Sequence, residues 1–320
     1  MALYDAIDIA ILQTIIYFDL FDFPLTEREI HCNLIGREAT SIKAIANRLK
    51  NQKLKTLLAQ TEGFYFLMGK QELVDCRKSR YQLAEEKYKI AQKNIRWLKL
   101  CPGVKAIFVT NKLAYANPRE AGDIDLAIIT APQKLWTARF WTTSLMKLLG
   151  RRPTKLNQTN KICLSFYLSE NNLNLQSTAK KHDVHLAFWL SQFVPIFDPD
   201  NLGPRILDQN RWIKSILPHA CFYDTTDRRR QNRAFMGTII NLTLGWIKES
   251  WLKRLQLRLM ALTLKNKVND GTGDVVLSDH LLKLHSLDRR EYYNNKWIEN
   301  CGRIIPRFQV QDIINLVIKK

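Results

Sequence analysis

The sequence has few cysteines, no long uninterrupted apolar run and no basic N-terminus. Its six cysteines are scattered over 320 residues without a Cys-x-x-Cys pair, which excludes a disulfide-stapled small domain. The longest apolar stretch, residues 236–247, is interrupted by polar side chains and stays below the ~18 residues that span a bilayer. The first ten residues carry acids where a signal peptide has bases. We therefore expect a reduced, cytoplasmic protein without a membrane partner.

Several common catalytic signatures are also missing. The chain has no Gly-x-Ser-x-Gly motif, no Walker-type phosphate loop and no dinucleotide-binding fingerprint, and it shows no internal repeat. Acidic residues are scarce relative to basic ones, because 30 Asp and Glu face 49 Lys and Arg, for a net charge of +19. A field of this size favours polyanionic partners such as nucleic acid. The alternative is a basic surface that is merely solvated.

What is present is the composition of an ordinary globular protein, with 46% hydrophobic and 25% charged residues. At roughly 100–200 residues per domain, the length indicates two or three domains. We place them at residues 1–80, 81–175 and 176–320.

Residues 1–80 have the pattern of three short helices followed by a hairpin. Apolar side chains recur at helical spacing over residues 5–21. The capping-box pattern Thr-Glu-Arg-Glu opens a second helix over residues 26–34. A third helix is predicted over residues 41–60, and the aromatic residues 64–67 read as a strand. This order predicts a winged helix-turn-helix domain.

The predicted third helix carries basic side chains that suit a phosphate backbone, and a second basic cluster lies in the last third of the chain. Winged helices also serve as packing modules, and basic residues on an exposed helix are commonly just solvated, so a scaffold role is the alternative. The candidate nucleic-acid-binding residues are Lys43, Arg48, Lys50, Lys53, Lys55, Arg228, Arg229 and Arg230.

A long, highly charged helix over residues 71–100 connects this domain to an α/β segment. Strands rich in β-branched residues are predicted over residues 104–110, 123–130 and 161–168, with an aromatic-rich helix between the last two.

The second of these strands begins with two acids, Asp123 and Asp125. Side chains alternate faces along a strand, so residues two apart point the same way and both carboxylates converge. Two ionised carboxylates repel each other unless a cation lies between them. A hard divalent cation such as Mg²⁺ resolves this conflict and is typical of phosphoryl-transfer sites.

This segment resembles the nucleotidyltransferase superfamily related to DNA polymerase β, over roughly residues 104–175. The resemblance is strongest over VKAIFVTNKLAYANPREAGDIDLAIIT. It implies a mixed sheet with helices, an NTP substrate, the cofactor Mg²⁺, and Asp123 and Asp125 as metal ligands and catalytic residues. In the family a Gly-Ser pair holds the nucleotide phosphates. Asn111 and Lys112 stand at that position here, so they are the candidate nucleotide-binding residues.

The sequence departs from the family at a second position. The family often has a third carboxylate on a neighbouring strand, where it activates the attacking hydroxyl. The corresponding strand here carries Cys163 and Ser165 and no acid, while Glu170 lies just past its end.

Residues 176–320 are predicted to be all-helical, with short helices starting at Leu277 and Arg289 among others. His182 and His185 are three residues apart without a further ligand at suitable spacing. We therefore expect ordinary surface histidines there rather than a metal site.

The expected fold class is α+β: an N-terminal winged helix, a central nucleotidyltransferase-like mixed sheet with helices, and a C-terminal helical region. The expected function is Mg²⁺-dependent transfer of a nucleoside monophosphate from an NTP to a hydroxyl acceptor, on a nucleic acid or a protein. The alternative is a non-catalytic nucleic-acid-binding or regulatory module on an inactive transferase scaffold.

Overall fold

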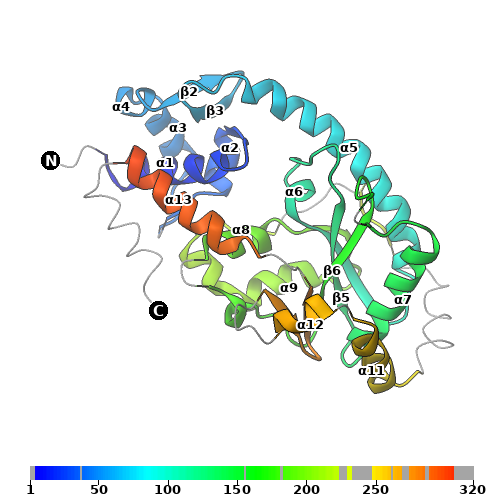
Figure 1. Cartoon of the computed structure of the whole chain (residues 1–320). Coiled ribbons are helices and arrows are strands. Elements are labelled where there is room, and N and C mark those ends of the chain that lie inside the picture. Colours follow the sequence, from blue (N-terminus) through cyan, green and yellow to red (C-terminus); the bar gives the residue numbers. More distant parts are fainter. Residues whose placement is uncertain are drawn as a thin grey trace.

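The computed structural model describes residues 4–36, 38–154, 156–180, 183–222, 229–232, 247–260, 262–268, 274–284 and 288–305. Over these ranges the chain forms a small antiparallel sheet with helices and a six-stranded mixed sheet with helices (Figure 1). The α+β class and the mixed sheet expected from the sequence are therefore confirmed.

The N-terminal residues form four short helices and a three-stranded sheet of order β1-β3-β2. Side-chain caps start two of these helices. The Asp5 carboxylate accepts hydrogen bonds from the backbone N–H groups of Ile7 and Asp8, and the Thr26 hydroxyl accepts one from Glu29. The elements are α1 (Ala6–Asp19), β1 (Leu25–Thr26), α2 (Glu27–Cys32), α3 (Ile42–Leu49), α4 (Gln52–Lys55), β2 (Leu58–Thr61) and β3 (Phe64–Leu67).

The helix expected over residues 41–60 is wrong in extent. α3 ends at Leu49, and Asn51 starts the separate turn α4 by accepting a hydrogen bond from the backbone N–H of Lys53. The chain then extends and pairs antiparallel with β3 as strand β2. Pairing with a neighbouring strand here outweighs the local helical pattern, as tertiary context commonly does.

Helix α5 (Leu73–Leu98) confirms the predicted connector and runs from the small sheet to the large one (Figure 1). Two arginines on it hold the two parts together. The Arg77 guanidinium donates to Glu29 Oε1 at 2.6 Å, and Arg80 donates to Asn117 Oδ1 at 2.8 Å. The N-terminal helices and the segment before β5 are therefore fixed to the same helix.

The large sheet has the strand order β7-β4-β5-β6-β9-β8, in which β5 and β6 are parallel and the other neighbours antiparallel. The short turn of helix α6 (Asn111–Ala114) lies between β4 and β5, and α7 (Leu135–Leu148) makes the crossover from β5 to β6. The strands are β4 (Val104–Val109), β5 (Ile124–Thr130), β6 (Ile162–Ser169), β7 (Val194–Phe197), β8 (Val275–Leu277) and β9 (Leu281–Leu284).

Alternation along the strands divides the apolar core between the two faces of this sheet. Ile124 and Ile128 of β5 pack on the face covered by α5 and α7. Ala127 and Ile129 pack on the opposite face, together with residues of the N-terminal helices and of the C-terminal part. Asp125 shares the parity of Ala127, so its side chain lies on this second face.

The expectation of an all-helical C-terminal region is wrong. Strands β7, β8 and β9 belong to it, and the helix predicted from Leu277 is a β8–β9 hairpin. These strands are only three or four residues long, so they carry too few residues to show a strand periodicity. The helical elements of this region are η1 (Gln176–Thr178), α8 (Val184–Ser191), α9 (Leu202–Gln209), η2 (Arg211–Ser215), α11 (Glu249–Leu259), α12 (Leu262–Val268) and α13 (Arg290–Ile304).

Helix α13 returns to the N-terminal part and packs beside α1 (Figure 1). The Trp297 side chain is 1% exposed, and its indole N–H donates to the backbone oxygen of Gln13 at 3.0 Å. The first and last described helices therefore form one wall of the molecule.

Within the described ranges, no helix combines the length and the hydropathy needed to cross a bilayer. Helix α5 has 26 residues, but it is charged along its length.

Candidate functional site

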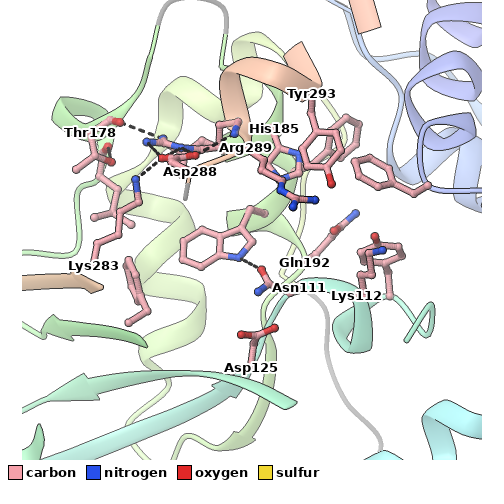
Figure 2. A pocket seen from close by; sticks show the side chains of 18 of the residues that line it. Asn111, Lys112, Asp125, Thr178, His185, Gln192, Lys283, Asp288, Arg289 and Tyr293 are labelled. Atoms are coloured by element: carbon pink, nitrogen blue, oxygen red, sulfur yellow. Dashed lines mark hydrogen bonds and ion pairs between the residues drawn. The ribbon is translucent and has the colours of Figure 1, made fainter. Parts of the chain in front are cut away.

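A cavity of about 330 Å³ opens between the start of β5 and the helices α1, α8 and α13 (Figure 2). Aromatic side chains from all three helices form much of its lining, among them Tyr17, Trp189 and Tyr293. Charged and amide groups are set between them. Those that matter for the chemistry below are Asn111, Lys112, Asp125, His185, Lys283 and Arg289.

Of the two predicted acids, Asp125 lines one end of this cavity, and Asp123 belongs to the same cluster of ligand atoms. Asp123 immediately precedes β5, and Asp125 is its second residue, so both carboxylates lie on one side of the strand. The parallel register pairs Asp125 with Cys163 of β6. Oxygen atoms of the two carboxylates and the Cys163 Sγ lie within 4.8 Å of one another. A thiol thus stands beside the acids, on the strand where the sequence lacks a third carboxylate.

The acid pair is electrostatically unfavourable without a cation. Burial and the nearby Asp123 carboxylate raise the pKa of Asp125 to about 6. Neither Asp123 nor Asp125 forms an ion pair with a described residue. Two carboxylates that share one place without a counter-charge are a donor set that suits a divalent cation.

Asn111 connects the acids to the aromatic lining. Its backbone φ is +57°, a left-handed value that Asn tolerates better than most residues. Its Oδ1 accepts a hydrogen bond from the Trp189 indole N–H at 2.7 Å, which leaves its amide N–H₂ to donate to Asp125 (Figure 2). Trp189 therefore orients the amide that contacts the acid.

Two cationic side chains face the cavity without an ion pair to any described residue: Lys112 of α6 and Arg289, just before α13. Burial lowers the pKa of Lys112, and repulsion from Arg119 and Arg80 lowers it further. Arg289 adds a smaller repulsion. Like charges held this close to each other indicate a place for an anion.

Two further cations of the cavity lining, Arg290 and Lys283, are already neutralised. Arg290 donates to Asp183 Oδ2 at 2.7 Å and to Asp288 Oδ2 at 2.8 Å, and Lys283 pairs with the same Asp288 carboxylate. Burial opposes the ionisation of Asp288, but the Lys283 and Arg290 charges outweigh it and lower its pKa. This network builds the wall and offers no net charge to a ligand.

Lys87 of α5 positions the segment that precedes Asp123. It is 1% exposed, and its ammonium donates to the backbone oxygens of Glu120 at 3.1 Å and Gly122 at 2.7 Å. A third hydrogen bond reaches Asn160 Oδ1 at 2.8 Å. The sequence gives no signal for this role, because Lys87 belongs to a helix with many exposed lysines.

The expectation for His185 is wrong. It is not an ordinary surface histidine, because it lines the cavity, where its Nδ1 is 2.7 Å from the Tyr17 hydroxyl and its ring stacks on Tyr293. Burial lowers its pKa to about 4, although the Asp183 carboxylate partly offsets the shift. His182, its predicted companion, lies outside the described residues.

The predicted nucleic-acid-binding residues fall on different elements. Lys43, Lys50, Lys53 and Lys55 are exposed on or beside α3 and α4, whereas Arg48 pairs with the carboxylates of Asp5 and Asp8. Arg229 pairs with Glu85 and lies over the Tyr88 ring, so its side chain packs against α5. Arg230 is exposed, and its charge acts on Asp198. Arg228 lies outside the described residues.

No known protein family, curated protein or solved structure matches the chain.

Lys87→Met should destabilise the protein and loosen the segment before Asp123. The substitution leaves three part-buried acceptors without their donor, which costs on the order of 1–3 kcal/mol in the free energy of unfolding. Lys89→Met is the matched control, since Lys89 is exposed on the same helix. Urea denaturation and hydrogen exchange over residues 118–123 measure the two effects. Equal stability of the two variants would contradict the role given to Lys87.

His185 should make the protein less stable as the pH falls from about 6.5 to about 4. Its pKa is near 6.5 in an unfolded chain and about 4 in the fold, so the unfolded state binds the extra proton between these values. Above about pH 6.5 the neutral imidazole makes its full contribution to stability. This contribution is lost as the pH falls towards about 4. The groups facing the ring are Asp183, Asp288, Arg290, Tyr17 and Tyr293.

The measurement is the free energy of unfolding of the wild type minus that of His185→Gln, taken by urea denaturation at pH 7, 5.5 and 4. The difference should fall with pH, by on the order of 1–3 kcal/mol. His280→Gln, at an exposed position, serves as the control. A pH-independent difference for His185→Gln would show that the ring is freely protonated in the fold.

Proposed function

We propose that the protein is a nucleotidyltransferase-like protein that binds an NTP with Mg²⁺ in this cavity and transfers a nucleoside monophosphate to a hydroxyl acceptor. The observation that carries the proposal is the pair Asp123 and Asp125, which meet without an ion-pair partner among the described residues, with Asp125 at one end of a cavity that Lys112 and Arg289 also line. A metal-bound triphosphate satisfies both requirements at once, because it brings a divalent cation to the acids and negative charge to the cations.

The donor set supports Mg²⁺ as part of this ligand. Carboxylate oxygens are the ligands that hard divalent cations prefer, and Asp123 and Asp125 offer them side by side. When bound, the ion would neutralise charge on the reacting phosphate and position it for in-line attack. The remaining contributions come from side chains of this chain.

Lys112 and Arg289 are the proposed triphosphate ligands. Both line the cavity, and neither forms an ion pair with a described carboxylate, although the Asp22 charge acts on Lys112. Phosphate oxygens between them would offset the mutual repulsion of these two cations. Asn111, fixed by Trp189, holds Asp125 in place through its amide. The family's Gly-Ser backbone cradle is thereby replaced by side-chain contacts.

The aromatic lining supplies surfaces for a nucleobase. Trp189 and Tyr293 lie on different helices that face the cavity, and each ring is only partly covered by its neighbours. Stacking of a base on an aromatic ring contributes ~1–3 kcal/mol and tolerates different bases. The acceptor hydroxyl belongs to a nucleic acid or a protein in this proposal.

The N-terminal part acts as a winged helix-turn-helix scaffold in this proposal. Tyr17 and Phe18 of α1 and Phe21 just after it line the cavity, so this part contributes directly to the site. Arg48, the arginine of the predicted recognition helix, is already engaged by Asp5 and Asp8. Both observations favour the packing role over the nucleic-acid-binding alternative.

Asp125→Asn should abolish stabilisation of the protein by Mg–NTP while leaving the ligand-free protein at least as stable as the wild type. The neutral amide removes the repulsion with Asp123, but it also removes a metal ligand. A nucleotide at about 100 times its dissociation constant stabilises the folded wild type by roughly 2.7 kcal/mol. Thermal unfolding with each Mg–NTP, with and without EDTA, reports this effect.

The control is Asp75→Asn, an exposed acid on α5 far along the chain from the site, which should behave as the wild type. An unchanged Mg–NTP response in Asp125→Asn would contradict the site assignment. The absence of any nucleotide response in the wild type would contradict the proposed function itself.

A further inference from the structure

Cys163 occupies an unusual place among the cysteines of this chain. In the described residues it is the only one whose sulfur belongs to a cluster with two carboxylates. The register of β5 and β6 puts it directly beside Asp125, and a shift in the register follows immediately, between Asp125 and Ala127. Its Sγ donates to Ser165 Oγ at 3.5 Å and lies within 4.8 Å of carboxylate oxygens of Asp123 and Asp125.

We propose that Asp123, Asp125 and Cys163 together bind a thiophilic divalent cation of the Zn²⁺ class, and that Mg²⁺ enters only with the nucleotide. This inference rests on the proposed function, since it concerns the same end of the same cavity. It goes beyond that function because it assigns a third protein ligand and predicts which ion the protein holds by itself.

The chemistry of the three ligands carries the assignment. Two carboxylates alone favour Mg²⁺, Ca²⁺ or Mn²⁺, whereas a thiolate shifts the preference towards Zn²⁺ and similar ions. Three protein ligands with a further position open to the cavity match the pattern of catalytic rather than structural zinc sites. The cavity beside Asp125 provides that open position.

The geometry is close to what a shared ion needs. With metal–oxygen and metal–sulfur distances of about 2.1 Å and 2.3 Å, two ligand atoms of a tetrahedral ion lie roughly 3.5 Å apart. The three ligand atoms here lie within 4.8 Å of one another before any ion draws them together. Small side-chain rotations at Asp123 and Asp125 complete the set.

Binding has a defined proton balance. The Cys163 thiol gives up its proton to solvent as the sulfur–metal bond forms, so each ion bound releases one proton from this ligand. The Ser165 hydroxyl, which accepts from the thiol in the free protein, turns to donate to the coordinated sulfur. The bound cation also offsets the repulsion between the two carboxylates.

Titration with Co²⁺ alone, followed by absorption in the presence of a non-thiol reductant, tests the proposal. The wild type should show a near-ultraviolet thiolate-to-cobalt charge-transfer band that saturates at one equivalent. One equivalent of Zn²⁺ should remove the band, and a large excess of Mg²⁺ should not. Cys163→Ser should lack the band and bind Co²⁺ at least about tenfold more weakly.

Two further variants make the test specific. Cys221→Ser removes an exposed thiol elsewhere and should leave the band intact. Cys163→Asp replaces sulfur by oxygen, so it should lose the band and gain affinity for Mg²⁺ relative to Zn²⁺. A wild type without the band, or a band that persists in Cys163→Ser, overturns the proposal.

Mg–NTP stabilisation of Cys163→Ser separates this inference from the proposed function. A missing cobalt band together with intact Mg–NTP stabilisation refutes only the thiol ligand. If Mg–NTP does not stabilise the wild type, the proposed function is refuted, whatever the cobalt spectrum shows.

Discussion

The alternation of side chains along β5 forces the carboxylates of Asp123 and Asp125 to share one side of the strand. The two carboxylates repel each other there, and the neighbouring residues of the site contact or surround this pair. Pairing with β6 adds Cys163 beside them. Lys87 fixes the segment before Asp123 through hydrogen bonds to neutral acceptors, so its charge attracts Asp123 without forming an ion pair with it. The site therefore holds two acids together and leaves their neutralisation to a ligand.

The rest of the cavity comes from segments far apart in the sequence. α1 and α13 are joined through Trp297, and the buried network around Arg290 sets the position of Arg289 beside the cavity. Arg290 and Lys283 thus have their charges paired, while Lys112 and Arg289 form no ion pair with a described residue. Paired charges give rigidity and unpaired charges give affinity for an anion, which explains why both kinds occur around one cavity.

Local patterns were sufficient for part of this picture. The period-two spacing of Asp123 and Asp125 correctly predicted that the acids converge, and the capping box at Thr26 correctly predicted a helix start. Strands β8 and β9 were missed because pairing between short segments is decided by distant neighbours rather than by their own pattern. For the same reason His185 was misjudged and Lys87 was not singled out, since their burial depends on acceptors and rings many residues away.

The most direct test of the central claim is anomalous diffraction from crystals grown with Mn²⁺ and a non-hydrolysable NTP. The account predicts an anomalous peak between Asp123 and Asp125, with the triphosphate extending from it towards Lys112 and the base against the aromatic lining. Metal and nucleotide found elsewhere on the protein, or an acid pair without metal beside a bound nucleotide, would contradict it.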